Sequence, residues 1–474
     1  MADKPNIVLV ECDSMDGRAM SCTKHLAAYT PHIDQLVDRG VLFQNTYCNS
    51  PQCCPSRASR WSGKHTHEIE GWNNYRGLEE GAPTYRTQLE SAGYRTQVYG
   101  KTDYVSGNHS LGARVYAWTR AAGIRLPQKE KPTEKLTCVP GDVERVHTRD
   151  WARVDQSLNW LRQHADRDQP FFLNCSLSAP HPAFVTSERW LEKVDLDRVT
   201  QPLWEDEQHP VMDYMSATKN CLHDFTESEI RAVRRTYFAM IAEVDAMVGC
   251  IFRAVSDLGL SDSTYVIFTS DHGEMNMEHR QYLKNAPYEA STRVPLIIAG
   301  PGVQQGDAVG HLVSLVDLYP TLMDMACLPH PEGLSGHSLM PALSGRKTRR
   351  SKTVLSQYHS NFASTGIFML RREQWKYIAY PGYKPQLFDL DSDPNELHDL
   401  SADRSDITRN MDRALRNLVN YPEVNRRAKD YDRESFLIWQ RSLGKEACRK
   451  TLAGLFRDTW MDAHTQQLEA WLER

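Results

Sequence analysis

The chain has 474 residues, 40% of them hydrophobic and 25% charged, which excludes a disordered protein and leaves room for one large domain and a smaller one. The formal net charge of −5 gives no support for nucleic-acid binding or a polybasic membrane face, and no apolar run approaches the length of a membrane span. We therefore expect no nucleic-acid partner and no membrane partner. The 11 cysteines lack regular spacing, so we also expect no disulfide framework.

The first predicted strand, residues 6–10, follows the N-terminus directly, without a signal peptide in front of it. We expect a cytoplasmic protein as the sequence stands, or a secreted, periplasmic or lysosomal one if a signal peptide has been removed. The run NIVLV is typical of a strand in the middle of a parallel sheet. Asp13 follows it, where α/β sheets place their ligands, although a helix cap or a turn is the alternative.

The stretch NSPQCCPSRASRWSG contains the run CCPSR, which begins at Cys53. By itself this run is compatible with a turn, because Pro and Ser favour turns and neighbouring cysteines usually fill small apolar spaces. It also fits the pattern Cys-x-Pro-Ser-Arg, and here the chain resembles the type I sulfatases. In that family a formylglycine-generating or an anaerobic sulfatase-maturating enzyme oxidises the first cysteine to formylglycine. The resemblance therefore implies modification of Cys53 rather than Cys54.

Formylglycine would give position 53 a chemistry that an ordinary side chain lacks. Sulfate monoesters carry a negative charge that repels nucleophiles, so attack at sulfur needs an activated oxygen and electrophilic help. A hydrated aldehyde has two hydroxyl groups on one carbon. One attacks sulfur and expels the alcohol; the other, once deprotonated, collapses back to the aldehyde and expels sulfate. A serine would perform only the first half.

Two cations acquire roles from the same resemblance. Arg57 corresponds to the arginine that steadies the aldehyde hydrate, with a solvated arginine as the alternative. Lys101 ends the run GYRTQVYGK, a short predicted strand followed by a loop, and corresponds to a catalytic lysine that binds sulfate oxygens. Many relatives have a histidine two positions later, where this chain has Asp103. The general base must then come from elsewhere, and His109 is one candidate.

Residues 107–149 are rich in Arg, Lys, Pro and Gly and show little periodicity. We expect this segment to run over the surface near the mouth of the site. There Arg114, Arg120 or Arg125 could meet an acidic substrate, with a solvated surface charge as the alternative for each.

A predicted helix over residues 151–164 leads into a strand over residues 170–176, followed by the run APHP that contains His181. This run resembles the family's Pro-His-x-Pro element, whose histidine hydrogen-bonds the substrate, so His181 is the predicted catalytic and substrate-binding histidine. A neutral imidazole near the leaving oxygen can act as an acid or a base. His209, on a longer loop, is the second substrate-binding candidate, and a turn residue is the alternative for both.

A long amphipathic helix is predicted over residues 229–258, and the next strand, residues 265–269, leads into Asp271 and His272. The resemblance places a metal here. The implied ligands are Asp13, Cys53 in its oxidised form, Asp271 and His272. Ser14 stands where the family usually has a second aspartate, and Asp16 lies close by. The family's ion is Ca²⁺, whereas the ligand set alone also admits Mn²⁺ or Mg²⁺.

Lys284 matches the family's second sulfate-binding lysine, also catalytic in this interpretation. Two lysines that converge on one tetrahedral oxyanion would stabilise a leaving sulfate. A buried strand is predicted at residues 296–299, and residues 313–326 resemble the family helix that closes the large domain.

Beyond residue 341 short β-rich runs replace the helical pattern. Four strands are predicted, as in a small antiparallel sheet, over residues 353–359, 366–371, 375–380 and 386–390. We predict a catalytic domain over residues 1–345 and, after a basic linker at 345–352, a C-terminal subdomain over 346–474 that ends in helices. The resemblance implies an α/β, alkaline-phosphatase-like fold with a large mixed central β-sheet flanked by helices.

The likeness runs from residue 5 to about residue 400, with the motifs in the family's order. Several segments resemble a member that acts on 2-sulfated glucuronate at the end of glycosaminoglycan chains. The resemblance thus implies a sulfuric ester hydrolase acting on a sulfated sugar, with the 2-O-sulfate of a terminal uronate as the expected target. Two alternatives stay open: a phosphonate monoester or phosphodiester hydrolase of the same superfamily, and a non-catalytic binding protein if Cys53 is unmodified.

Overall fold

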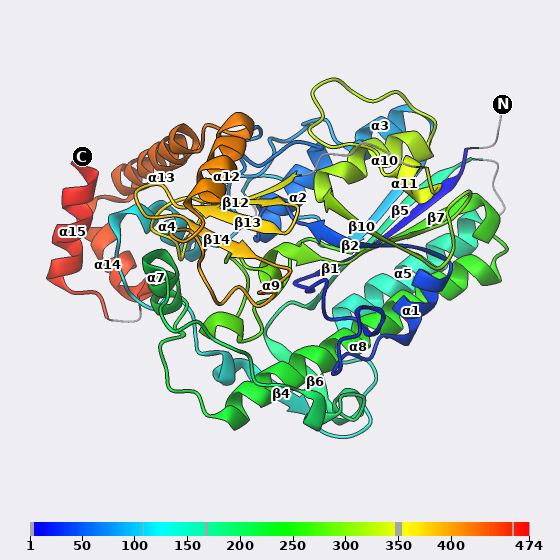
Figure 1. Ribbon diagram of the computed structural model, residues 1–474, viewed down its shortest axis with the longest axis horizontal. Coiled ribbons are helices and arrows are strands. Elements are labelled where there is room, and N and C mark those ends of the chain that lie inside the picture. The colour runs from blue at the N-terminus through cyan, green and yellow to red at the C-terminus, as the bar shows by residue number, and fades with distance from the viewer. Residues whose placement is uncertain (1–3, 108, 166–168, 347–352, 457–458, 474) are drawn as a thin grey trace.

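The computed structural model (Figure 1) describes residues 4–107, 109–165, 169–346, 353–456 and 459–473. The linker predicted at residues 345–352 lies largely outside the described residues, and the division into two domains near residue 345 stays a prediction. Within the described ranges, no helix is both long and apolar enough to cross a membrane.

A mixed eight-stranded sheet forms the centre of the molecule, in the order β10-β2-β9-β7-β1-β5-β3, with β8 paired to β2. Its strands are β1 (Asn6–Asp13), β2 (Gly40–Tyr47), β3 (Arg95–Gly100), β5 (Phe171–Pro180), β7 (Thr264–Ser270), β8 (Arg293–Val294), β9 (Leu296–Ala299) and β10 (Asp307–Ser314). β1 is parallel to β5 and β7, β3 is parallel to β5, and β9 is antiparallel to β2 and β7. The C-terminal ends of β3, β5, β1 and β7 therefore meet at one edge, where α/β sheets bind ligands.

Helices cover both faces of this sheet, as Figure 1 shows. Alternate residues of β1 point to opposite faces: Val8 and Val10 into one core, Ile7 and Leu9 into the other. The first core is closed by α1 (Pro31–Asp38), α5 (Thr148–His164) and α8 (Glu227–Asp257). The second is closed by α2 (Cys53–Ser62), α3 (Tyr85–Ser91), α10 (Leu318–Met325) and α11 (Met340–Leu343). The predicted mixed sheet with flanking helices is confirmed.

The four predicted C-terminal strands form a separate antiparallel sheet in the order β11-β12-β13-β14. They are β11 (Thr353–Tyr358), β12 (Ile367–Arg372), β13 (Trp375–Ala379) and β14 (Gln386–Asp389). The terminal helices are α12 (Ser405–Leu418), α13 (Tyr421–Leu443), α14 (Lys445–Leu455) and α15 (Asp462–Leu472). One face of the small sheet packs toward Tyr47 at the end of β2, and the other packs on α12 and the start of α13.

The prediction for residues 107–149 was wrong in part. This segment contains α4 (Leu111–Trp118), two short helices, η2 (Arg120–Ala122) and η3 (Pro132–Lys135), and β4 (Leu136–Val139), which pairs with β6 (Phe184–Ser187). Val115 and Trp118 of α4 are buried against the C-terminal helices, so contacts distant in sequence stabilise this helix.

Residues 313–326 do not form one helix either, because Val313 and Ser314 complete β10. The remaining short helices are η1 (Ser21–Thr23), α6 (Glu188–Leu191), η4 (Leu196–Arg198), α7 (Pro210–Thr218), η5 (Ser261–Ser263), η6 (Glu278–Arg280), α9 (Glu289–Thr292) and η7 (Leu315–Asp317).

Candidate active site

Cys53 is the first residue of α2, a helix whose residues are all buried. The chain reaches it from β2 through a segment that the small sheet holds: Asn49 accepts a hydrogen bond from the main chain of Gln357, at 2.8 Å. Cys53 and Cys54 point to different surroundings. The Cys53 sulfur lies 3.2 Å from His272 Nε2, whereas the Cys54 sulfur packs against Gly77.

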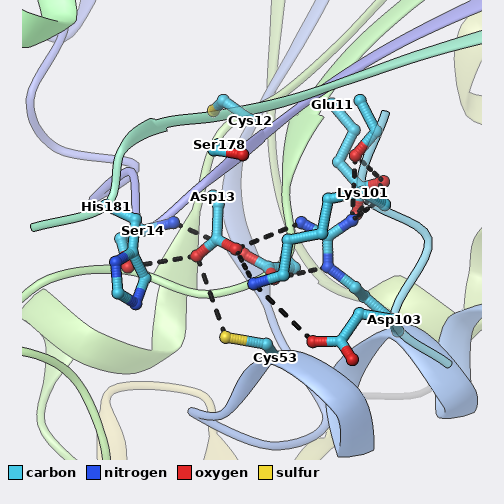
Figure 2. A network of polar contacts seen from close by, with 12 residues as sticks. Glu11, Cys12, Asp13, Ser14, Cys53, Lys101, Asp103, Ser178 and His181 are labelled. Carbon is cyan, nitrogen blue, oxygen red and sulfur yellow. Dashed lines mark hydrogen bonds and ion pairs between the residues drawn. The ribbon is translucent and has the colours of Figure 1, made fainter. Parts of the chain in front are cut away.

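A buried cluster contains the Cys53 sulfur. Figure 2 shows the contact of this sulfur with Asp13, at 3.9 Å. The potential ligand atoms of the cluster lie within 4.8 Å of one another and come from Asp13, Cys53, Asp271 and His272. Asp13 ends β1 and Asp271 follows β7, its direct neighbour in the sheet. His272 Nε2 lies 3.5 Å from Asp13 Oδ1 and 3.6 Å from Asp271 Oδ1. The parallel pairing of two strands thus brings together residues that are far apart in the sequence.

The donor set of this cluster fits a divalent cation. Two carboxylates and an imidazole are common ligands of such ions, and donors around one ion are separated by the few ångströms observed here. His272 Nδ1 lies 3.0 Å from the Gly273 carbonyl oxygen, a contact that keeps the proton on Nδ1 and turns the lone pair of Nε2 toward the cluster. Burial raises the pKa of Asp271 to about 6, so burying this carboxylate in its charged form costs free energy that a nearby cation would offset.

Arg57, one helical turn after Cys53, joins the carboxylates beneath the cluster. Its Nε donates to Asp271 at 2.7 Å, and Nη1 and Nη2 lie 3.0 Å and 3.5 Å from Glu11 and Asp13. The side chain is fully buried, so the alternative of a solvated arginine is wrong. Burial disfavours the charged form, but these carboxylates outweigh it and raise the pKa of Arg57 well above its ordinary value.

Lys101 reaches the cluster from the end of β3. Gly100 makes the turn possible: its φ is 96°, and a Cβ there would overlap with the carbonyl of Ser176. Lys101 Nζ lies 2.5 Å from Asp13 Oδ2 and 3.6 Å from Asp103. Although burial acts to raise it, Lys101 and the neighbouring cations hold the pKa of Asp13 well below its ordinary value.

His181 and Lys284 form the opposite wall. Lys284 Nζ lies 2.5 Å from His181 Nε2, and His181 Nδ1 donates to the Pro182 carbonyl at 2.5 Å. Burial first, and then the charge of Lys284, lower the pKa of His181. This histidine is therefore neutral at pH 7, with its lone pair on Nε2 facing the lysine.

The combined field at position 53 favours an anion. Burial and the nearby Asp13 act to raise the pKa of the Cys53 thiol, yet the surrounding cations lower it well below its ordinary value. Lys101 and Lys284 make the largest of these contributions. The site is electrostatically complementary to a small oxyanion that approaches residue 53.

A family model described as "Sulfatase" matches residues 5–327, more than half of the chain. The chain belongs to the sulfatase family. A second model, "N-sulphoglucosamine sulphohydrolase, C-terminal", matches residues 277–421. This sulfatase is 44% identical over 469 residues to arylsulfatase K of Bos taurus, an alignment that covers 94% of this chain and 87% of that protein. These matches show that the chain is a sulfatase enzyme.

Solved structures share the fold of this sulfatase. A phosphonate monoester hydrolase of Agrobacterium radiobacter superposes with a TM-score of 0.72 and 23% identity, over 88% of this chain and 95% of that one. A protein described as a 2-O GAG sulfatase superposes with a TM-score of 0.68 and 22% identity, over 90% and 94%. The alkaline-phosphatase-like fold expected from the sequence is confirmed.

Ser14 and Asp16, the two candidates for the family's second aspartate, differ in position. Ser14 Oγ lies 3.3 Å from Asp13 Oδ1 and 3.5 Å from His272 Nδ1. The Asp16 carboxylate instead pairs with Arg18 at 2.7 Å. Of the two, Ser14 therefore borders the cluster of this sulfatase.

The structure places His209 in a different setting from His181. It caps the start of α7, where Nδ1 accepts from the main chain of Val211, and its Nε2 donates to the Lys384 carbonyl at 2.9 Å. Its ring stacks on Tyr380. Both ring nitrogens are engaged within the protein, so these contacts give no support to the prediction that His209 binds substrate.

The three arginines expected to meet an acidic substrate have partners within the protein. Arg120 is buried and pairs with Asp432 at 2.8 Å, so this expectation was wrong for Arg120. Arg125 pairs with Asp213, and Arg114 stacks over the ring of Tyr75. The candidate base His109 lies 2.9 Å from Asp103, whose carboxylate lies 3.6 Å from Lys101 Nζ.

Sequence reasoning missed two groups that shape the site. Glu11 accepts from Arg57 and Arg60 inside the sheet, and a charged residue within an apolar strand was the available signal. Lys219, fully buried after α7, donates to the main-chain carbonyl of Lys284 and to Gln281 Oε1. No local pattern marked this lysine, because its partners lie more than sixty residues away.

Proposed function

We propose that this sulfatase removes the 2-O-sulfate from a terminal glucuronate of glycosaminoglycans, using a formylglycine made from Cys53 and a divalent cation. The ligands in this proposal are Asp13, residue 53, Asp271 and His272. One observation carries it: the Cys53 sulfur lies 3.2 Å from His272 Nε2, inside the carboxylate cluster and in the field of Lys101 and Lys284. The sugar specificity is supported by the resemblance of several segments to a sulfatase of 2-sulfated glucuronate.

Each side chain of the site has a role in this proposal. When bound, a divalent cation supplies electrophilic polarisation at residue 53. Lys101 and Lys284 bind the sulfate oxygens and stabilise the charge that develops on them in the transition state. Arg57 holds Asp13 and Asp271 in place from below. We assign Ca²⁺ as the ion; Mn²⁺ and Mg²⁺ are the competitors in reconstitution.

His181 would manage the proton of the leaving alcohol. Its imidazole is neutral, and Nε2 contacts Lys284, a lysine that has sulfate oxygens as its alternative partners. When Lys284 turns to the sulfate, the lone pair of Nε2 becomes available to accept a proton, and the imidazolium that forms can donate it to the leaving oxygen. The contact between His181 and Lys284 thus couples substrate binding to proton handling.

Two measurements test the proposal. Peptide mass spectrometry at residue 53, after co-expression with a formylglycine-generating or anaerobic sulfatase-maturating enzyme, should show loss of the thiol sulfur and gain of oxygen. Desulfation of defined 2-, 3-, 4- and 6-sulfated sugar termini should then be fastest on 2-sulfated glucuronate. An active enzyme with an unmodified Cys53, or a clear preference for another sulfate position, contradicts the proposal. An unmodified and inactive protein points to a binding role instead.

A second candidate is a phosphonate monoester hydrolase, favoured by the fold likeness with a TM-score of 0.72. The charges that hold a sulfate also suit a phosphonate, because both present tetrahedral anionic oxygens. Turnover of a sulfate and a phosphonate ester of the same phenol distinguishes the two. Faster phosphonate turnover would favour this second candidate.

A further inference from the structure

Lys129 lies on a segment that is fastened to the loop carrying Lys284. On one side of it, the main chain of Gln128 donates to the Thr218 carbonyl at 2.8 Å. On the other side, the Tyr282 hydroxyl donates to the Glu130 carbonyl. These two hydrogen bonds fix the backbone on both sides of Lys129 against α7 and the loop that contains Tyr282.

The same scaffold positions Lys284. Lys219, the residue after Thr218, donates from its ammonium to the main-chain carbonyl of Lys284 and, at 3.0 Å, to Gln281 Oε1. Lys129 and the sulfate-binding lysine are therefore anchored to adjacent residues at the end of α7. These hydrogen bonds set the relative position of the two lysine backbones.

Lys129 is exposed to solvent. In the described part of the chain, its ammonium forms no hydrogen bond or ion pair. Its neighbour Glu130 pairs with Lys135 at 2.9 Å. Desolvation by the surrounding protein lowers the pKa of Lys129, and the like charge of Lys284 lowers it further, while Cys53 acts in the opposite direction. The group therefore lies within electrostatic reach of position 53, and the attraction of Glu130, which pairs with Lys135, does not outweigh these effects.

A sulfated uronate carries two anions, on opposite sides of its sugar ring. In the proposed function Lys101 and Lys284 bind the sulfate, which leaves the carboxylate to a second cation. We infer that Lys129 binds this carboxylate and so makes the site specific for a sulfated uronate over a neutral sulfated sugar; this inference rests on the proposed function. Lys129 thereby takes the role that the sequence suggested for the arginines of residues 107–149.

Lys131 provides a matched control on the same segment. Its charge acts on His223 and on Glu229 at the start of α8. The variants Lys129→Gln and Lys131→Gln remove one charge each, two residues apart. A difference between them therefore reports position and not net charge.

The experiment compares two substrates of the mature holoenzyme: a 2-sulfated glucuronate terminus and the same sugar with its carboxylate reduced to an alcohol. The ratio of the two kcat/KM values measures recognition of the carboxylate. We expect Lys129→Gln to lower this ratio by about 10- to 100-fold, mainly through KM, since a charge-assisted hydrogen bond contributes this much. Lys131→Gln should keep the wild-type ratio, and Lys129→Arg should restore part of it.

Each outcome has one meaning. Suppose that the wild type cleaves the uronate and prefers it to the reduced sugar. If Lys129→Gln then has the same ratio of kcat/KM values as the wild type, the inference is overturned and the proposed function stands. An equal loss on both substrates also overturns it, because Lys129 would then act on the sulfate or on the fold. A wild-type enzyme that does not cleave the uronate overturns the proposed function and this inference with it. Turnover of 4-nitrophenyl sulfate verifies that each variant is folded and matured.

Discussion

Charged side chains are buried in two regions of this sulfatase, and they are arranged in opposite ways. Where the large sheet meets the small one, Lys376 of β13 lies 2.9 Å from Glu289 and 2.7 Å from Glu396, and all three side chains are buried. The main chain of Glu289 donates to Glu396, and the Tyr47 hydroxyl donates to Glu289 at 3.1 Å. These charged groups pair with one another inside the protein.

At the edge of the large sheet the charges are instead directed at a common point. Asp13, Asp271 and His272 turn donor atoms toward the Cys53 sulfur, and Lys101 and Lys284 add positive charge around it. Arg57 balances the carboxylates from the buried side only. The comparison indicates that charges paired with one another contribute to the stability of the fold, whereas charges directed at a common point are available to bind a ligand. Changes in the first region should alter stability, and changes in the second should alter rate.

The largest effect should come from Cys53→Ala. In the proposed function this side chain carries the reacting group, so its removal should lower kcat/KM on an aryl sulfate by at least about 10⁴-fold, as for other covalent nucleophiles. Cys54→Ala is the matched control, since its sulfur packs against Gly77, outside the cluster, and this variant should keep much of the activity. Equal losses from both variants would contradict the assignment of Cys53.

Lys376→Met should separate stability from rate. The change leaves two buried carboxylates without their shared cation, and it should lower the free energy of unfolding by about 3–5 kcal/mol. Denaturant unfolding measures this loss, and Lys384→Met, at an exposed position, should change stability by less than about 0.5 kcal/mol. The folded fraction of Lys376→Met should keep the wild-type kcat. A large drop in kcat would break the distinction between the two regions.

Lys284→Ala should lower the rate and leave the stability almost unchanged. In the proposed function the Lys284 ammonium stabilises the developing charge, so its loss should lower kcat by about 10²–10³-fold. Stability should change little, because Lys219 holds the main-chain carbonyl of this residue and not its side chain. Lys284→Arg keeps the charge and should recover part of the rate. Thermal unfolding and steady-state kinetics on the same preparation test both statements.

The smallest effect concerns acid stability through Glu289. Burial acts to raise its pKa, but Lys376 and Arg293 outweigh burial and lower it to about 2, below the ordinary value of 4.5. The stabilisation is therefore present above pH 4.5 and is lost as the pH falls to about 2, and it amounts to about 3 kcal/mol at most. The stability advantage of the wild type over Glu289→Gln should shrink across this window.

The measurement must compare wild type with Glu289→Gln, because a second buried carboxylate, Glu396, also titrates. Burial, with the negative charge of Glu289, raises its pKa, so its contribution to stability changes with pH in the opposite direction. Urea unfolding of wild type and Glu289→Gln at several pH values removes the part that both proteins share. A constant difference across the window would show that Glu289 is not the titrating partner of Lys376.

Much of the secondary structure could be predicted because its signals are local. The strand at residues 296–299 was predicted with the observed bounds, and the four strands of the small sheet were predicted within one residue at each end. The helix α4 was missed because Val115 and Trp118 are buried by helices more than 300 residues further along the chain. A local pattern does not report contacts at that separation.

In the site, too, local patterns were informative and contacts distant in sequence were not predicted. Short motifs identified the residues that could carry chemistry, from Asp13 to Lys284. They did not indicate that both nitrogens of His209 are engaged at the start of α7, or that Lys219 holds the loop of Lys284. Both outcomes depend on the side chains that reach a residue from distant segments.

The sequence by itself determined which strands are buried, which family the chain resembles and which side chains are able to react. Only the tertiary structure decided which of these side chains meet. The pairing of β1 with β7 and β5 brings their C-terminal ends to one edge, and the start of α2 presents Cys53 there. Strand order is set by packing across the whole sheet, a property that no single segment encodes.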